Sequence, residues 1–368
     1  MSVREKEAVE KLPLYKAARS LESVSREYGL NEKDIIKLAG NENRFGCSPE
    51  VIEAIKEQAV NFSYYPDMNV TELRKALSEK HNIPPENLVF GNGSFELITL
   101  IGSAYIDKGD EVIYNDPSFG WYINVTKQNQ GTLIKIPVNE KKAVDTEAIL
   151  NAVTDKTKVI WLCNPNNPTG TLIPSDVLSD FIERVQESVL IVLDEAYYDF
   201  IDGEYIDTVE FVKKHDNVIL LRTFSKAHGL ASFRIGYGIA DGKIIDAVNK
   251  VRLPLNVSRA SQTAALAALN DKDFTDFIVK TNREQLEFYY SEFERIGLEY
   301  IPSHGNFVLV NIGIDSKYAE LEFLKKGIVI RNGEEFGLPQ WLRISVGRPE
   351  ENQKVISTLE SIIKEAAE

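Results

Sequence analysis

The stretch RTFSKAHGLASFRIGYG, residues 222–238, joins an apolar run to a lysine that stands among small residues. This lysine, Lys226, lies between Ser225 and Ala227, and Arg234 follows further along. A lysine that only keeps a surface soluble usually stands among other charges. Lys226 therefore suggests a chemical role at the end of a buried strand, which the rest of the sequence must support.

Strand and helix patterns alternate on the N-terminal side of this stretch and within it. Strands, several of them continuous apolar runs typical of buried parallel strands, are expected at 111–116, 158–164, 189–196 and 217–223. Helical periodicity occurs at 48–60, 94–106 and 176–186. This alternation predicts an α/β fold with a mostly parallel sheet and helices on both faces.

The pattern changes after about residue 250. A long amphipathic helix is expected at 274–297 and another at 350–368, with short strands at 307–312, 328–331 and 341–347. Few strands with helices on one side indicate a smaller α+β domain. We therefore expect three parts, which are an N-terminal arm (1–30), a large domain (45–269) and a small domain (31–44 and 270–368).

The composition excludes several classes of protein. The 368 residues, 43% of them hydrophobic, are enough for two folded domains. A net charge of −14 argues against nucleic-acid binding, and no apolar run is long enough to cross a membrane. The histidines show no metal-ligand spacing, and Cys47 and Cys163 are read as reduced thiols. We expect a cytoplasmic protein that acts on small molecules and holds no metal.

Polar segments follow the expected strands, where parallel sheets bind their ligands. These segments are VFGNGS (89–94), read as a turn before a helix, NPNNPTG (164–170), DEAYYDF (194–200) and TFSKAHG (223–229). Each has an ordinary structural explanation on its own. NPNNPTG has the composition of an ordinary turn. A buried Asp194 would be explained by an arginine partner, and Lys226 by exposure to solvent. Together at one edge of a sheet they favour a ligand site.

The combined groups fit pyridoxal 5′-phosphate, abbreviated PLP. The residues expected around its phosphate are Gly93, Ser94, Phe95, Ser225 and Arg234. Asp194 would keep the ring nitrogen protonated, and Asn167 and Tyr197 would donate to the phenolic oxygen. Lys226 would form a Schiff base with the aldehyde and then act as the base that moves the substrate proton. Burial near Arg234 should lower the pKa of Lys226.

The chain also resembles fold-type I PLP-dependent aminotransferases, and within them the histidinol-phosphate aminotransferase family. The resemblance runs from about residue 12 to the C-terminus. The matching motifs, in the family's order, are KLAGNENRFGCSP (37–49), YYPD (64–67), GNGSFELI (91–98), NPNNPTG, DEAYYDF, RTFSKAHGLASFRIGY and LRISVG (342–347).

The resemblance implies a role for each matching residue. Lys226, Asp194 and Tyr197 would be catalytic, and Thr223 would join the phosphate site. Phe119 stands where the family has a ring that stacks on the cofactor. The residues implied at the substrate are Arg343 for a carboxylate, Arg331 for a distal phosphate, Asn167, and Tyr15 in the arm. Tyr65 would reach the cofactor of a second subunit, which implies a homodimer with shared sites. His228, where the family often has phenylalanine, is read as a packing residue.

The resemblance implies a ping-pong transamination between histidinol phosphate and 2-oxoglutarate, as in histidine biosynthesis. Departures from the family pattern lie near the expected substrate mouth, including Phe95 and the pair Arg348 and Pro349. Two alternatives therefore stay open, an aminotransferase for aromatic or other specialised amino acids and a PLP-dependent decarboxylase of an amino-acid phosphate. A cofactor-binding regulator is disfavoured, because the arm is too short for a helix-turn-helix domain.

Overall fold

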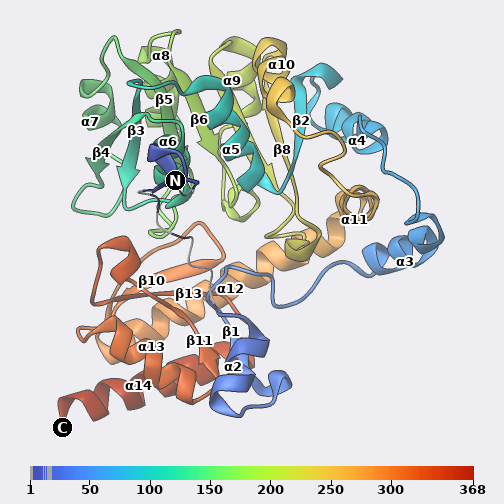
Figure 1. Cartoon of the computed structure of the whole chain (residues 1–368). Coiled ribbons are helices and arrows are strands. Elements are labelled where there is room, and N and C mark those ends of the chain that lie inside the picture. The colour runs from blue at the N-terminus through green and yellow to red at the C-terminus, as the bar shows by residue number, and fades with distance from the viewer. Residues whose placement is uncertain (1–2, 11, 13, 15–18) are drawn as a thin grey trace.

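A seven-stranded sheet forms the centre of the larger part of the computed structural model, which describes residues 3–10, 12, 14 and 19–368. Its strand order is β2-β8-β7-β6-β5-β3-β4 (Figure 1). The strands are β2 (Leu88–Asn92), β3 (Glu111–Asp116), β4 (Thr132–Pro137), β5 (Thr157–Cys163), β6 (Leu190–Asp194), β7 (Val218–Thr223) and β8 (Ile235–Ala240). Strand β8 runs in the opposite direction to the other six strands of this sheet.

Both faces of this sheet are buried because successive side chains of each strand enter different cores. On β5, Ile160 and Leu162 belong to one core, and Val159 and Trp161 to the other. Helices α3 (Pro49–Gln58), α4 (Thr71–His81), α7 (Thr146–Asn151), α8 (Ser175–Arg184), α9 (Val209–Lys214) and α11 (Arg259–Asn270) cover the first face. Helices α5 (Ser94–Tyr105), α6 (Trp121–Gln128) and α10 (Gly242–Val251) cover the second.

The C-terminal part forms a second, smaller layer below this sheet (Figure 1). Its antiparallel sheet has the order β12-β13-β10-β9, and β1 pairs with β11. The strands are β1 (Ile36–Lys37), β9 (Glu299–Ile301), β10 (Phe307–Asn311), β11 (Ile328–Val329), β12 (Arg331–Asn332) and β13 (Trp341–Ser345). Helices α12 (Lys272–Ile296), α13 (Ser316–Lys325) and α14 (Pro349–Ala367) pack on one face.

Alternation along β13 decides what its other face presents. Leu342 and Ile344 pack into the core with the helices, so Arg343 between them points away from that core. Phe307 on β10 likewise leaves this core and packs with Tyr197, in the segment that follows β6 of the large sheet. The free face of the small sheet is therefore turned toward the ends of the large strands.

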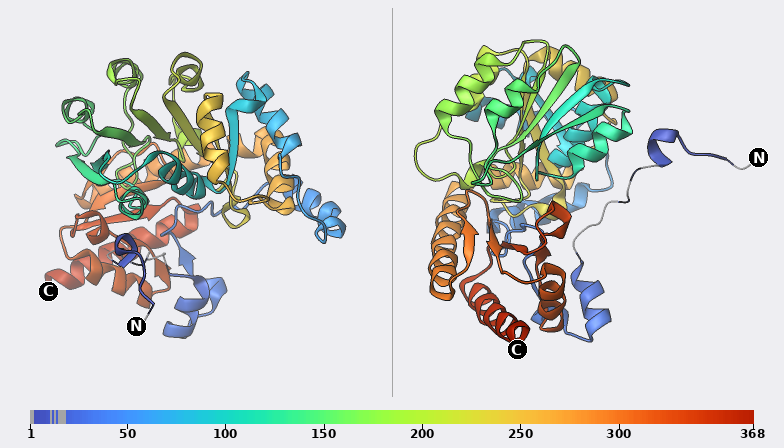
Figure 2. Two further views of the ribbon diagram at one scale, coloured as in Figure 1. Left: turned by 45° about the horizontal axis from the view of Figure 1, so that its top comes forward. Right: turned by 90° about the vertical axis from the view of Figure 1, so that its left-hand side faces the viewer.

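The N-terminal segment differs from the expected arm. Helix α2 (Leu21–Tyr28) is capped by Ser20, and its Val24 packs with Leu324 and Val329 of the small layer. Helix α1 (Glu7–Glu10) lies near α6, away from the small layer (Figure 2). Residues 21–28 thus pack with the part that we expected to begin at residue 31.

The structure confirms the fold class and the expected helices and strands, and it adds elements that were not expected, among them strands β4, β8 and β9. The segment VFGNGS was read as a turn, but most of it belongs to strand β2. Strand β8 was not expected, because its sequence IGYGIA is rich in glycine. Gly236 is needed there, since a Cβ atom would lie 2.4 Å from the backbone nitrogen of Ser94. Among the described residues, no helix is long and apolar enough to cross a membrane.

Candidate active site

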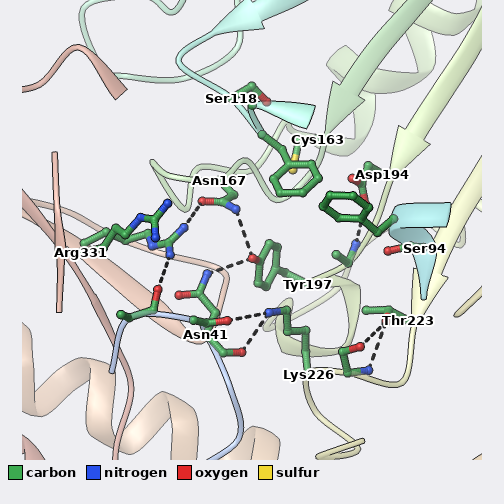
Figure 3. Close-up of a pocket in the computed structure, with 18 of the residues that line it drawn as sticks. Asn41, Ser94, Ser118, Cys163, Asn167, Asp194, Tyr197, Thr223, Lys226 and Arg331 are labelled. Atoms are coloured by element: carbon green, nitrogen blue, oxygen red, sulfur yellow. Dashed lines mark hydrogen bonds between the residues drawn. The ribbon is translucent and has the colours of Figure 1, made fainter. Parts of the chain in front are cut away.

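A cavity of about 710 Å³ lies between the carboxyl ends of the large sheet and the free face of the small sheet. The segments after β2, β5, β6 and β7 all line it, as expected from a parallel sheet. The small layer contributes Arg331, Arg343 and the segment that contains Asn41 (Figure 3). Most of the expected residues come together here from both layers.

Lys226 follows β7 and turns its amine toward the segment that joins the two layers. Its Nζ donates to the carbonyl oxygens of Gly40 at 3.0 Å and Asn41 at 3.1 Å. Burial lowers the pKa of Lys226 to about 8, and the charge of Arg343 adds to this effect. Arg234, named from the sequence, contributes less than Arg343. An amine with this pKa can give up its proton near neutral pH.

Asp194 is the last residue of β6, and strand alternation turns it to the same face as Val192. There Tyr122 of α6 donates its hydroxyl hydrogen to Oδ2 at 2.6 Å, and the Ala196 amide donates to Oδ1 at 3.3 Å. Burial raises the pKa of Asp194 to about 6, although both hydrogen bonds oppose the rise. The side chain is ready to pair with a protonated group in the cavity.

The sequence also allowed Asp194 to pair with a buried arginine, but it is the neighbouring residue, Glu195, that forms such a pair. Glu195 points to the other face and binds Arg222, with Oε2 and Nε 2.8 Å apart. Among the described residues, no arginine forms an ion pair with Asp194. The buried arginine pair that the sequence allowed therefore exists, but it uses Glu195 and leaves Asp194 to the cavity.

Tyr197 stands in the middle of a polar network (Figure 3). Its hydroxyl oxygen accepts hydrogen bonds from Nδ2 of Asn41 at 2.9 Å and from Nδ2 of Asn167 at 3.3 Å. Burial raises the pKa of Tyr197 above its usual range, so the hydroxyl keeps its hydrogen. Asn41 was not identified as a site residue from the sequence, although it lies within the matched motif KLAGNENRFGCSP.

An anion cradle lies at the start of α5. The cap residue Gly93 has a φ of +74°, and the helix begins at Ser94 without a side-chain cap. A Cβ atom on Gly93 would lie 2.4 Å from Nη2 of Arg234. The first N–H groups of the helix and a guanidinium thus meet at one place, which suits a phosphate.

Thr223 and Ser225 complete this cradle. The Thr223 hydroxyl donates to Oγ of Ser225 at 3.0 Å, and Nη1 of Arg234 donates to the same Oγ at 3.4 Å. Arg234 has a φ of +52°, uncommon for a residue with a side chain, and also donates to the Ala231 carbonyl at 3.0 Å. These contacts aim the guanidinium at the cradle.

Aromatic rings form one wall. The ring of Phe119 meets Phe95 and Tyr122 edge to face, with centroid distances of 5.7 and 5.6 Å. The ring of Phe95 lies against Trp121 at 4.5 Å. Phe119 and Phe95 both line the cavity. A flat heteroaromatic ring could pack against this wall.

Two arginines of the small sheet face the cavity. Arg343 is buried and donates from Nη1 to Oδ1 of Asn167 at 2.6 Å and from Nη2 to the Ala39 carbonyl at 2.7 Å. Arg331 lies opposite Arg343 in the antiparallel register and forms an ion pair with Glu335. Figure 3 shows Arg331 at the opposite end of the site from Ser94.

The cavity does not include every expected residue. Tyr65 is 83% exposed and does not line the cavity of its own chain. Tyr15 lies outside the described residues. His228 packs its ring on Phe224 at 4.9 Å and shares a hydrogen bond of 3.2 Å with Thr275, as expected of a packing residue.

Some lining residues were missed from the sequence. They are Asn41, Glu42, Lys37, Glu335 and Phe336, which line the cavity, and Tyr122, which holds Asp194. The alternation of side chains along β6 shows from the sequence which face of the sheet Asp194 points to. Which residue of α6 it contacts there depends on how the helix packs.

The groups present fit PLP. The cradle at Gly93 has no room for a side chain and carries positive charge, as a phosphate requires. Asp194 offers a buried carboxylate for a pyridine nitrogen, and Tyr197 offers a hydroxyl for the phenolic oxygen. Lys226 supplies an amine of lowered pKa for the aldehyde.

Comparisons with known proteins agree with this geometry. The family described as aminotransferase class I and II matches residues 33–359. A relative from Carboxydothermus hydrogenoformans, named histidinol-phosphate aminotransferase 2, is 42% identical over 361 residues, covering 98% of this chain and 99% of the relative. One from Geobacillus, named histidinol-phosphate aminotransferase, is 41% identical and covers 96% of both chains.

A solved structure is similar in three dimensions. The histidinol-phosphate aminotransferase of Sinorhizobium meliloti, determined in complex with PLP, superposes with a TM-score of 0.92. It is 28% identical, and the match covers 100% of this chain and 99% of that one.

Proposed function

The chain belongs to the family of class I and II aminotransferases, and we propose that it transfers the amino group of histidinol phosphate to 2-oxoglutarate. The observation that carries the choice of substrate is Arg331, which lies across the cavity from the anion cradle and beside Arg343 (Figure 3). A donor that reacts in the middle of the cavity would reach this cation with a distal phosphate. Near-full-length relatives bearing the histidinol-phosphate aminotransferase name support the same choice.

The enzyme uses PLP, which when bound supplies an electron sink for the charge that develops at the substrate carbon. Gly93, Ser94, Phe95, Thr223, Ser225 and Arg234 would hold its phosphate. Asp194 would hold the proton on the ring nitrogen, because a buried carboxylate stabilises a cation next to it. Tyr122 keeps that carboxylate oriented through its hydroxyl. Phe119 would lie against the ring.

The proton transfers would fall to Lys226. Its amine is buried, has a pKa of about 8 and already hydrogen-bonds two backbone carbonyls that keep it in the cavity. A neutral amine at this position would accept the proton from the substrate Cα and would deliver it to the aldehyde carbon of the cofactor, on the other side of the amino nitrogen. The Tyr197 hydroxyl, held by Asn41 and Asn167, would donate a hydrogen bond to the phenolic oxygen of PLP and so orient the cofactor.

Arg343 would orient the carboxylate of glutamate or 2-oxoglutarate. Its two terminal nitrogens donate in parallel to neutral oxygens of Asn167 and Ala39. A carboxylate binds a guanidinium more strongly than a neutral acceptor does, and its two oxygens match this geometry. Because both half-reactions of a ping-pong enzyme use the same site, Arg331 would bind the distal charge of either substrate.

The visible absorption spectrum of the purified protein tests this proposal. A band of protein-bound PLP that is lost on adding histidinol phosphate and regained on adding 2-oxoglutarate would support it. A band that responds to glutamate and to phenylalanine but not to histidinol phosphate would favour the aromatic alternative. Formation of glutamate from 2-oxoglutarate during turnover separates transamination from decarboxylation.

Homodimer formation and a cytoplasmic location belong to the same proposal. Around Tyr65 lies an exposed apolar group, Val60, Tyr64 and Met68, with exposures of 81%, 69% and 49%. Such a group on an otherwise acidic protein fits a contact between two copies. Mixing Tyr65→Ala with an inactive Lys226→Ala chain tests a shared site. Mixed dimers would regain about one quarter to one half of the activity lost by Tyr65→Ala if Tyr65 serves the partner's site, which follows from random pairing.

A further inference from the structure

The arginine expected to read the distal charge already has an anionic partner. Arg331 pairs with Glu335, four positions along the chain, and both side chains line the cavity. We propose that Glu335 is a resident counter-ion that a substrate's distal anion must displace from Arg331, so that Glu335 sets the selectivity between charged and uncharged substrates. This inference rests on the proposed function for the identity of the phosphorylated donor.

The two arginines that the small sheet places in the cavity are held in different ways. Arg343 donates to neutral oxygens, at 2.6 Å to Asn167 and 2.7 Å to Ala39, and its side chain is fixed between the rings of Phe307 and Phe336. Arg331 is bound by a carboxylate instead. Of these two arginines, Arg331 is the one that pairs with a carboxylate among the described residues, so an incoming anion must compete with Glu335 for its guanidinium.

Glu335 is placed where it can move. Its side chain is 37% exposed, compared with 14% for Arg331. It lies in the short 3-10 helix Glu334–Phe336, which ends at Gly337 with a φ of +71°. The turn has its own anchors, because Nζ of Lys317 pairs with the Glu334 carboxylate at 2.7 Å and the Glu334 amide donates to Asn332 at 3.2 Å. The Glu335 carboxylate can leave Arg331 without loss of the turn.

The charges of Arg331 and Glu335 cancel at the far end of the cavity when the two side chains are paired. With Glu335 in place, the far end of the cavity offers a neutralised ion pair, which an uncharged side chain can approach. When a phosphate or carboxylate arrives, it takes the guanidinium and Glu335 turns to solvent. Each binding event then breaks one partly exposed ion pair and forms another, so Glu335 weakens the binding of anionic substrates selectively.

Glu335→Gln in the PLP-bound enzyme tests this inference, with Glu334→Gln as the matched control. Both variants remove one carboxylate from the same turn, but Glu334 pairs with Lys317 and does not line the cavity. The readout is the ratio of KM for histidinol phosphate to KM for histidinol. We expect Glu335→Gln to lower this ratio by up to about fivefold, the upper end of the contribution of one partly exposed ion pair. Glu334→Gln should leave it unchanged.

Two results would overturn the inference. A higher KM for histidinol phosphate in Glu335→Gln would show that Glu335 holds Arg331 in position, and an equal change for both donors would show that it does not sense charge. If the unaltered enzyme rejects histidinol phosphate, the proposed donor is wrong, and glutamate and glutamine then serve as the charged and uncharged pair. Glu335→Gln must favour glutamate in that comparison for the inference to stand.

Discussion

Arg331 and Arg343 occupy opposite positions on the antiparallel strands β12 and β13, and both side chains line the same cavity. Like charges on neighbouring strands repel unless they have partners. Here Glu335 and the oxygens of Asn167 and Ala39 supply them. The pair makes this end of the cavity suitable for substrates that carry two negative groups or one phosphate.

Replacing Arg331 with alanine should weaken the phosphorylated donor most. A hydrogen bond to a charged group contributes about 1.5–3 kcal/mol, so KM for histidinol phosphate should rise about 10- to 100-fold. KM for histidinol or phenylalanine should change far less, because neither has a distal anion. Steady-state kinetics with the three donors measure this. An equal loss for all of them would mean that Arg331 reads no phosphate.

Replacing Lys226 with alanine should stop turnover while PLP still binds through the cradle at Gly93. The expected fall in kcat is about 1,000-fold or more, since both the covalent anchor and the base are lost. Lys226→Arg keeps the positive charge but cannot act as this base at neutral pH, and it should be as inactive. Retained turnover in either variant would remove Lys226 from the mechanism. PLP content is measured spectroscopically in parallel.

The burial of Asp194 predicts a pH-dependent stability of the protein without cofactor. Its pKa is about 6 in the folded protein against 3.8 for an ordinary aspartate. Because the folded state binds this proton more tightly, the free energy of unfolding should fall as the pH rises from about 4 to about 6. The fall should reach up to about 3 kcal/mol, at about 1.4 kcal/mol per pKa unit.

The variant Asp194→Asn does not titrate and serves as the reference in urea unfolding of the cofactor-free protein. The difference in unfolding free energy between the two proteins should grow in favour of the variant over this pH window and then level off. Parallel pH profiles for the two proteins would contradict the raised pKa. In the enzyme with PLP, the same variant should lose most of its activity, because the ring nitrogen loses its anionic partner.

Replacing Gly93 with alanine should lower the affinity for PLP about tenfold or more. The new Cβ atom would lie 2.4 Å from Nη2 of Arg234 and would displace the guanidinium from the phosphate site. Gly109→Ala is the matched control, because Gly109 also has a positive φ, +94°, but nothing lies within 4 Å of its Cβ position. Gly93→Ala should also lose about 1–3 kcal/mol of stability, because its φ of +74° with a ψ of 163° is essentially confined to glycine, and Gly109→Ala should lose stability through its own positive φ.

PLP titration of both variants separates this strain from loss of the cradle. Only Gly93→Ala should bind PLP more weakly. A similar loss of affinity in Gly109→Ala would show that the effect reflects general destabilisation. Unchanged affinity in Gly93→Ala would mean that Arg234 and the start of α5 do not form the phosphate site.

The sequence alone predicted the buried strands β3, β5, β6 and β7, five of the helices and the edge of the sheet where the site lies. Period-two apolar runs and helical periodicity depend on residues close in the chain, so they can be read without knowing the fold. Asp194 and Lys226 were found because Asp194 ends such a run and Lys226 lies three residues after another. The resemblance to a family added roles for Arg331 and Arg343, which have no local signature.

Only the tertiary structure decided which side chains meet across long separations. Tyr122 and Asp194 lie 72 positions apart, and Asn41 and Tyr197 lie 156 apart. The antiparallel insertion of β8, the packing of α2 in the small layer and the partner of Arg331 were likewise decided by packing. Local sequence sets the direction in which a side chain points, whereas the group that it meets depends on how separate elements bury their apolar faces together.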